Sequence, residues 1–391
     1  MRAFGKFLGR FLFVSGIALI AFLWFAPGYL ENQLNPVADH APYEISEATQ
    51  ALHDDLVIGD WHADSLLWNR DLLDRGSRGQ VDIPRLREGN VAVQVFTAVT
   101  KSPAGLNYEQ NATEAPDNIT RLSIAQLWPP RTWDSLLERA LYQAERLHDY
   151  ERRAPDQIKI IRNATDLEDV LTRRAAGEDI LGAILGIEGG HPLEGDLANL
   201  DKLTDAGYRL VGLQHFFDNE LGGSLHGTGN RGLTDFGRSV VDAVIERGLI
   251  LDVAHSSPQV ARDVLAMTDI PIVVSHTGLH SHCRVKRNFT DDLMKDIAAT
   301  GGVIGIGYWR DVTCDETPAG IATAIKAAIA VVGEDHVSLG SDFDGSVRTA
   351  FDTSELAALT QALLDAGLPE SQIRKVMGEN MLRVLRARLD P

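Results

Sequence analysis

Short apolar runs recur along most of the chain, with Gly, Asp or His at their ends. Such near-continuous apolar runs are typical of strands that are buried on both faces, as in a parallel sheet. The pattern therefore predicts eight buried strands. They lie at residues 56–62, 91–99, 180–190, 209–216, 249–257, 270–278, 301–309 and 336–345.

Helical patterns separate most of these runs. Each tends to start after Ser, Thr or Asp and to end near Gly, which are the usual helix start and stop signals. The expected helices cover 44–55, 196–206, 234–247, 257–267, 290–299 and 317–332. Eight strand–helix units in succession predict an α/β fold, a (β/α)8 barrel of the TIM type. The alternative is an open doubly wound sheet, but no Gly-rich phosphate-binding motif follows the first run, which weakens its dinucleotide-binding version.

Two insertions interrupt this rhythm. Residues 100–155 follow the second run and include a helix at about 132–153, and residues 217–233 follow the fourth run and are rich in Gly. Both would lie at the carboxyl ends of the strands, where barrels build their active sites. We expect a wall or lid over a substrate there, with ordinary surface loops as the alternative.

The first 30 residues differ from the rest of the chain. Three basic residues precede an uncharged apolar run at 11–30, whose twenty residues would cover roughly 30 Å as a helix. We predict a signal-anchor or transmembrane segment at 1–30, a connector at 31–50 and one catalytic domain at 51–391. That domain would lie on the periplasmic or extracellular side. Cleavage of the segment as a signal peptide, with secretion of the domain, is the alternative.

Composition narrows the class of protein. The 391 residues are 44% hydrophobic and carry 37 basic against 55 acidic side chains, a net charge of −18. Such a chain can build a large core, and the lack of a basic stripe argues against nucleic acid as a partner. The two cysteines, Cys283 and Cys314, could form one disulfide in an exported domain or remain free buried thiols.

Side chains of the types that bind metals, His, Asp and Glu, recur at the carboxyl ends of the predicted strands. In a barrel these ends form a ring at one mouth, so residues far apart in sequence become neighbours. Imidazole and carboxylate ligands suit zinc and related hydrolytic metals, and the set exceeds what one catalytic zinc needs. We therefore expect two metal ions, with Glu188 as a bridge. The ring comprises His62, Asp64, Glu188, His215, His255, His276 and Asp342.

Other polar residues receive more modest interpretations. Asp252 either orients His255 or is an ordinary strand-end residue, and Asp344 would shape a turn with Gly345. A structural or supporting role is expected for His191, His280 and His282. Exposure to solvent is expected for His40, His53, His148, His226 and His336.

Seven motifs in order along residues 55–385 carry a family resemblance. They are GDWHAD, GIEGGHPLEG, LVGLQHF, LDVAHSS, VVSHTG, CRVKRN and GSDFDG. Together they resemble the membrane (renal) dipeptidase family of zinc metallopeptidases. The resemblance implies a (β/α)8 barrel that hydrolyses dipeptides with two Zn²⁺ per chain, and it leaves open whether the protein is a homodimer. The chain departs from the pattern at Ala63 and in the Gly-rich segment 217–233.

The resemblance also implies a metal-ligand set. His62 and Asp64 would bind one zinc ion, and His255 and His276 the other. Glu188 would bridge the two ions, and a hydroxide bridging the metals would attack the peptide bond.

The remaining implied roles concern the substrate. His215 would polarise the scissile carbonyl, Arg287 would bind the terminal carboxylate, and Asp342 would transfer protons. Cys283 and Cys314 fall where members of the family carry a disulfide. Two alternatives stay open: another barrel amidohydrolase acting on an N-acyl amino acid, lactam or lactone, and a binding domain without activity.

Overall fold

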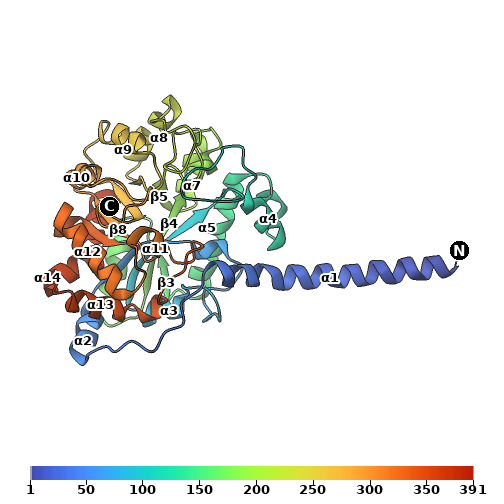
Figure 1. Cartoon of the computed structure of the whole chain (residues 1–391), viewed down its shortest axis with the longest axis horizontal. Helices are drawn as coiled ribbons and strands as arrows, with labels where there is room; N and C mark the ends of the chain where they lie inside the picture. The colour runs from blue at the N-terminus through green and yellow to red at the C-terminus, as the bar shows by residue number, and fades with distance from the viewer. Residues whose placement is uncertain (1, 391) are drawn as a thin grey trace.

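Eight parallel strands close into a barrel in the computed structural model, which describes residues 2–390 (Figure 1). Each strand pairs with its neighbours; β1 joins β9 through Asp60 and Leu339, and β2 pairs with β4 from Val93 to Val99. The predicted (β/α)8 barrel is confirmed, and the open sheet is wrong. The strands are β1 (Ile58–Ala63), β2 (Val91–Val99), β4 (Leu181–Glu188), β5 (Tyr208–Gly212), β6 (Ile250–Asp252), β7 (Val273–Thr277), β8 (Val303–Ile306) and β9 (Val337–Leu339).

A further strand, β3 (Ile158–Ile160), was not expected. It pairs in parallel with residues 181–183 at the start of β4, beside the stretch of β4 that pairs with β5. Its three residues are too few to show a hydrophobic pattern, and partly exposed Lys159 interrupts them. The strand therefore extends one side of the barrel without altering its closure.

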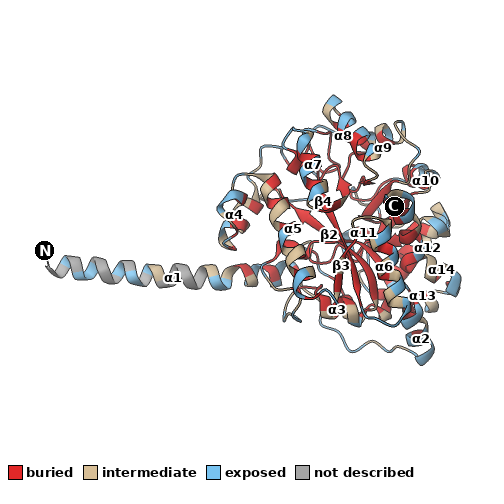
Figure 2. Cartoon of the chain, turned by 180° about the vertical axis from the view of Figure 1, so that it is seen from behind, coloured by how far each residue is buried: buried red, intermediate tan, exposed pale blue. Residues whose placement is uncertain are grey.

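Helices surround the barrel, with exposed outer faces (Figure 2). Several begin at the predicted signals: the side chains of Thr234, Ser257 and Thr317 each accept a hydrogen bond from the amide three residues later, which satisfies a free N–H of the first turn. The helices are α2 (Glu47–Asp55), α3 (Ile83–Glu88), α4 (Asn118–Ala125), α5 (Leu136–Arg153), α6 (Ala164–Ala175), α7 (Ala198–Asp205), α8 (Asp235–Glu246), α9 (Pro258–Leu265), α10 (Asp291–Ala299), α11 (Arg310–Thr313), α12 (Pro318–Val332), α13 (Ala357–Asp365), α14 (Glu370–Arg374) and α15 (Asn380–Arg388).

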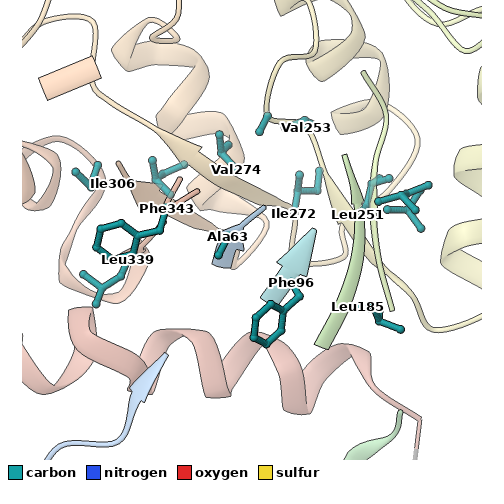
Figure 3. Close-up of a cluster of buried hydrophobic side chains, with 14 of the residues drawn as sticks. Ala63, Phe96, Leu185, Leu251, Val253, Ile272, Val274, Ile306, Leu339 and Phe343 are labelled. Carbon is teal, nitrogen blue, oxygen red and sulfur yellow. The ribbon is translucent and has the colours of Figure 1, made fainter. Parts of the chain in front are cut away.

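The strands are buried on both faces, as their apolar sequences predict. Adjacent residues of a strand enter different clusters: Val274 packs in one and Val273 in the other. The first cluster joins the strands to surrounding helices and contains residues from all eight barrel strands, among them Phe96, Leu185 and Leu339 (Figure 3). The second includes residues of α15. Close packing on both faces gives a rigid frame for the strand ends.

The N-terminal segment forms one helix, α1 (Arg2–Leu34), which projects away from the barrel (Figure 1). It continues past the expected boundary at residue 30, and its last turn packs on the barrel through Glu31, which is 1% exposed. A search of the described residues finds no helix whose length and apolar character suffice to cross a membrane. The anchor at 1–30 stays a prediction.

A disulfide joins Cys283 to Cys314 and settles the choice between a bond and two free thiols. The bond links the loop after β7 to the C-terminal end of α11. The loop it fixes contains Arg287, which is 2% exposed. The covalent link thus restrains a charged residue that packs at the mouth of the barrel.

We expect the double variant Cys283→Ser, Cys314→Ser to lose about 3–4 kcal/mol of unfolding free energy, because a bond spanning 31 residues restricts the unfolded chain. Urea denaturation of the oxidised protein and the variant measures the difference. Dithiothreitol should shift the wild-type midpoint toward that of the variant and leave the variant unchanged. Equal midpoints for the oxidised protein and the variant would contradict the prediction.

Candidate active site

The barrel brings the expected ring of residues together at the carboxyl ends of its strands. His62, Glu188 and His276 belong to β1, β4 and β7, and the other four follow their strands within three residues. Arg287, from the loop after β7, joins them. All are buried, at 7% exposure or less. They are His62, Asp64, Glu188, His215, His255, His276, Arg287 and Asp342.

Glu188 lies at the centre of this ring. Its Oε1 is 3.2 Å from Nε2 of His255, 3.4 Å from Nε2 of His276 and 3.5 Å from Nε2 of His62. Its Oε2 is 3.3 Å from Nε2 of His215. One carboxylate therefore faces four imidazoles, which is the arrangement expected of a bridging ligand.

Two more carboxylates approach His62. Its Nε2 lies 3.4 Å from Oδ1 of Asp64 and 3.9 Å from Oδ1 of Asp342. Asp64 is held in place by Thr97, whose hydroxyl donates to Oδ1 at 2.6 Å. The ligand-type atoms fall into three overlapping groups that could each hold an ion: His62, Asp64 and Glu188; Glu188, His215 and His255; and His62, His276 and Asp342.

The histidine pair His255 and His276 is oriented for a shared cation. Their Nε2 atoms are only 2.8 Å apart. The Ser275 hydroxyl donates a hydrogen bond to Asp252 at 2.6 Å. Its oxygen can therefore accept a hydrogen bond from Nδ1–H of His276 at 2.9 Å. This assigns the lone pair of His276 to Nε2, inside the ring. Asp252 thus orients His276 through Ser275, and not His255 as one interpretation of the sequence had it.

The charges buried in the ring suit a bound cation. Burial raises the pKa of Asp342 to about 8, and burial together with nearby Asp64 raises the pKa of Glu188 well above its usual value. Burial alone would lower the pKa of His62, but Glu188 and Asp64 outweigh it and raise the pKa to about 10. Burial lowers the pKa of His255 far below its ordinary value. A cation would let the carboxylates ionise beside neutral imidazoles.

Two donor atoms of the ring lack hydrogen-bond partners in the described part of the chain, as expected of metal ligands. Nε2 of His62 and Oε2 of Glu188 are buried and have no hydrogen-bond partner among the described residues. Buried polar atoms seldom remain unpaired, because each costs free energy. Nitrogen and carboxylate donors of this kind suit zinc, and their number exceeds the needs of one ion.

The tautomer of His215 is set by a backbone carbonyl. Its Nδ1 lies 3.2 Å from the carbonyl oxygen of Lys101, so Nδ1 must carry a proton. The neutral ring then presents a lone pair at Nε2, and donation from Nε2 requires the imidazolium form. Burial lowers the pKa of His215 to about 4. The imidazole of His215 is therefore a hydrogen-bond acceptor in the free protein at neutral pH.

A cavity with about 580 Å³ of free space, part of it open to solvent, lies over the ring. Asp64, Glu188, His255, Arg287 and Asp342 contribute its polar wall. The apolar and aromatic wall includes Leu67, Val99, Leu106, Tyr108, Ile119, Phe216 and Trp309. Leu106, Tyr108 and Ile119 come from the insertion at 100–155, which confirms the prediction that this segment forms a wall of the site.

Tyr108 and His226 were not identified from the sequence. Tyr108 accepts a hydrogen bond from Nε1 of Trp309 at 3.1 Å. His226, expected to be solvated, is fully buried; its Nδ1 binds the carbonyl of Tyr108 at 2.7 Å and its ring stacks on Phe216. The segment 217–233 therefore packs behind the aromatic wall. Neither residue follows an apolar strand, so the strand-end pattern could not find them.

The remaining histidines are not part of the ring. His53 was also expected to be solvated but is buried, with contacts to Thr360 at 2.9 Å and the carbonyl of Gly89 at 3.2 Å. His191 is buried beside the ring. Partial burial is observed for His148, His280, His282 and His336, and His40 is exposed as expected.

Comparisons with known proteins identify relatives of the chain. Residues 46–389 match the family described as membrane dipeptidase (peptidase family M19). The chain is 28% identical to dipeptidase aclJ of Aspergillus oryzae over 78% of this chain and 69% of that protein. It is 26% identical to dipeptidase ataJ of Aspergillus terreus over 79% and 76% of the two chains.

Solved structures share the fold. The probable dipeptidase PvdM of Pseudomonas aeruginosa superposes with a TM-score of 0.72, at 21% identity, over 87% of this chain and 97% of that chain. A metallopeptidase of Rhodobacter sphaeroides, liganded with a phosphinate mimic of the dipeptide L-Ala-D-Ala, gives 0.69 at 24% identity over 85% and 100%.

We expect Glu188→Ala to abolish tight zinc binding, because it removes the carboxylate shared by two of the three groups of ligand-type atoms. Ser275→Ala should weaken binding by about 10–100-fold, since it frees the ring of His276. Elemental analysis after dialysis and titration with a chromophoric chelator measure both effects. Glu168→Ala, which changes an exposed carboxylate, is the matched control. Full zinc content in Glu188→Ala would contradict the site.

Proposed function

Because the chain belongs to the membrane dipeptidase family, we propose that it hydrolyses dipeptides at this mouth with two zinc ions. The observation that carries the proposal is the buried carboxylate of Glu188, surrounded by four imidazole nitrogens in the cavity that also holds Arg287. The phosphinate mimic of L-Ala-D-Ala bound by the Rhodobacter sphaeroides protein supports dipeptides as the substrate class.

The metal ligands would be divided between two ions as the family resemblance implies. His62 and Asp64 would hold one ion, His255 and His276 the other, and Glu188 both. When bound, such a pair lowers the pKa of water and polarises a carbonyl. Two residues of the ring remain free for the substrate, His215 and Asp342.

Arg287 would bind the terminal carboxylate of the dipeptide. Its Nη2 donates to the carbonyl of His276 at 2.7 Å, and the Trp309 ring lies 5.9 Å from its guanidinium carbon. These contacts fix the plane of the guanidinium. Its buried Nε has no partner among the described residues, so this donor is free to bind a substrate. A planar carboxylate suits such a fork, because two parallel hydrogen bonds can form.

Asp342 would transfer the proton. The attacking water must lose a proton, and the amide nitrogen must gain one as the C–N bond breaks. Asp342 lines the cavity, and its Oδ1 lies 3.9 Å from Nε2 of His62, so its carboxyl stands beside the proposed metal site. It would accept the proton of the water and return it to the leaving amine.

His215 would polarise the scissile carbonyl. Its Nε2 points toward Glu188 and its Nδ1 is fixed by Lys101. Donation to the carbonyl oxygen requires the imidazolium form, which developing negative charge on that oxygen would favour. The imidazole of His215 would therefore bind the transition state better than the ground state.

We also propose that the barrel lies outside the cytoplasm. The disulfide between Cys283 and Cys314 supports an oxidising compartment. The uncharged run at 11–30 would anchor the chain in a membrane, and cleavage of that run would leave a secreted enzyme. A homodimer stays a prediction.

We expect a free dipeptide to be turned over with a kcat/KM about 100-fold above that of its N-acetylated form. The acetyl group removes the ammonium, the only feature that separates a dipeptide from an N-acyl amino acid of similar size. Chromatography of released amino acids measures both rates. Equal rates would reject a dipeptidase and favour the amidohydrolase alternative.

We expect Asp342→Asn to lower kcat by about 10²–10⁴-fold while zinc content stays near that of the wild type, because the amide cannot shuttle a proton. Steady-state kinetics and elemental analysis of the same preparation measure the two effects. Asp311→Asn, on an exposed carboxylate, is the matched control. Full activity of Asp342→Asn would remove the residue from the mechanism.

A further inference from the structure

The turn that carries Asp342 has an unfavourable backbone. Asp342, Asp344 and Ser346 have φ values of 61°, 62° and 65°, in the left-handed region that residues other than glycine seldom adopt. Asp342, Gly345 and Ser346 line the cavity together. Such a conformation persists only where surrounding contacts impose it. The contacts that hold this turn therefore determine where the Asp342 carboxyl lies.

Asp344 anchors the centre of the turn. This fully buried carboxylate accepts hydrogen bonds from the Ser65 hydroxyl and the Gln80 amide, both at 2.7 Å, and pairs with Arg70. Its own amide donates to Oε1 of Gln80 at 2.7 Å. The role is larger than the simple turn expected with Gly345, because Asp344 ties the turn to the segment after β1.

The N-terminal segment holds the same network from outside. Glu31 is buried at the end of α1, where Oε1 accepts from Nε of Arg70 and Oε2 from Nε of Arg78, both at 2.5 Å. Arg70 thus bridges Glu31 and Asp344. A carboxylate is rarely buried unless it is paired, and here both of its oxygens are.

Residues 35–38 bind the far end of the turn directly. Oδ1 of Asn35 accepts a hydrogen bond from the amide of Ser346 at 2.7 Å. The amide of Ala38 donates to the carbonyl of Thr349 at 2.8 Å, and the amide of Thr349 donates to Pro36 at 3.2 Å. A segment that served only as a tether would need no contact with a residue of the cavity wall.

We propose that Glu31 and Asn35 are positioning residues of the active site. Residues 31–38 hold the turn 342–346 in its left-handed conformation and so fix the Asp342 carboxyl over the ring. The inference rests on the proposed function for its catalytic meaning. It also implies that any shortened form of the protein needs these residues for full activity, whatever happens to the helix before them.

The test compares Asn35→Ala with Asn35→Asp in the full-length, zinc-loaded protein. The alanine removes the acceptor for the Ser346 amide, whereas the aspartate keeps an oxygen in place. Gln33→Ala, on an exposed residue near the end of α1, is the control. Hydrogen exchange of the peptide that covers 341–349 reports on the turn without reference to activity, and kcat and KM for a dipeptide report on catalysis.

We expect faster exchange in Asn35→Ala, a fall in kcat of about 10–100-fold with KM within about twofold, and unchanged zinc content. Asn35→Asp should recover most of both losses. Unchanged exchange and kcat would overturn the proposal, as would a loss of kcat that matches a loss of zinc or that Gln33→Ala shares. If the wild type does not cleave dipeptides, the proposed function fails, and exchange at 341–349 alone decides whether residues 31–38 hold the turn.

Discussion

The burial of Glu188 at the centre of the barrel mouth is the constraint on which the site depends. Burial and nearby Asp64 raise the pKa of this carboxyl, and burial lowers the pKa of three of the four imidazoles that face it. A cation at the mouth would therefore stabilise the carboxylate beside neutral imidazoles. Asp64 and Asp342 increase the negative charge further. The strand ends deliver nitrogen atoms to within 3.5 Å of Glu188 Oε1. A metal centre is the arrangement that satisfies all of these groups at once.

Supporting carboxylates around the ring keep it in this geometry. Asp60 accepts from the amide of His62 at 2.9 Å and from the amide of Ser341 at 3.0 Å, which locks β1 to the strand end that carries Asp342. Asp252 does the same between the ends of β6 and β7 through its contacts with Ser275. Two buried acids, Asp60 and Asp252, thus support the strand ends that carry His62, His276 and Asp342.

The sequence predicts the barrel and the ring because both follow from local pattern. A polar residue at the end of an apolar run, such as His255 or His276, must lie at the mouth once the strands are parallel. Contacts between residues that are far apart in the sequence leave no such local pattern. Glu31 contacts Arg70 and Arg78 across 39 and 47 residues, and His226 is buried by a loop whose Gly-rich sequence reads as solvent-exposed. The three-residue strand β3 is too short to leave a pattern.

Anomalous X-ray diffraction from crystals of the zinc-loaded protein, recorded at the zinc absorption edge, tests the central claim most directly. We expect two peaks at the barrel mouth, with the Glu188 carboxylate between them. One should lie beside His62 and Asp64, and the other beside His255 and His276. A single peak, or zinc bound elsewhere with the mouth empty, would contradict this claim.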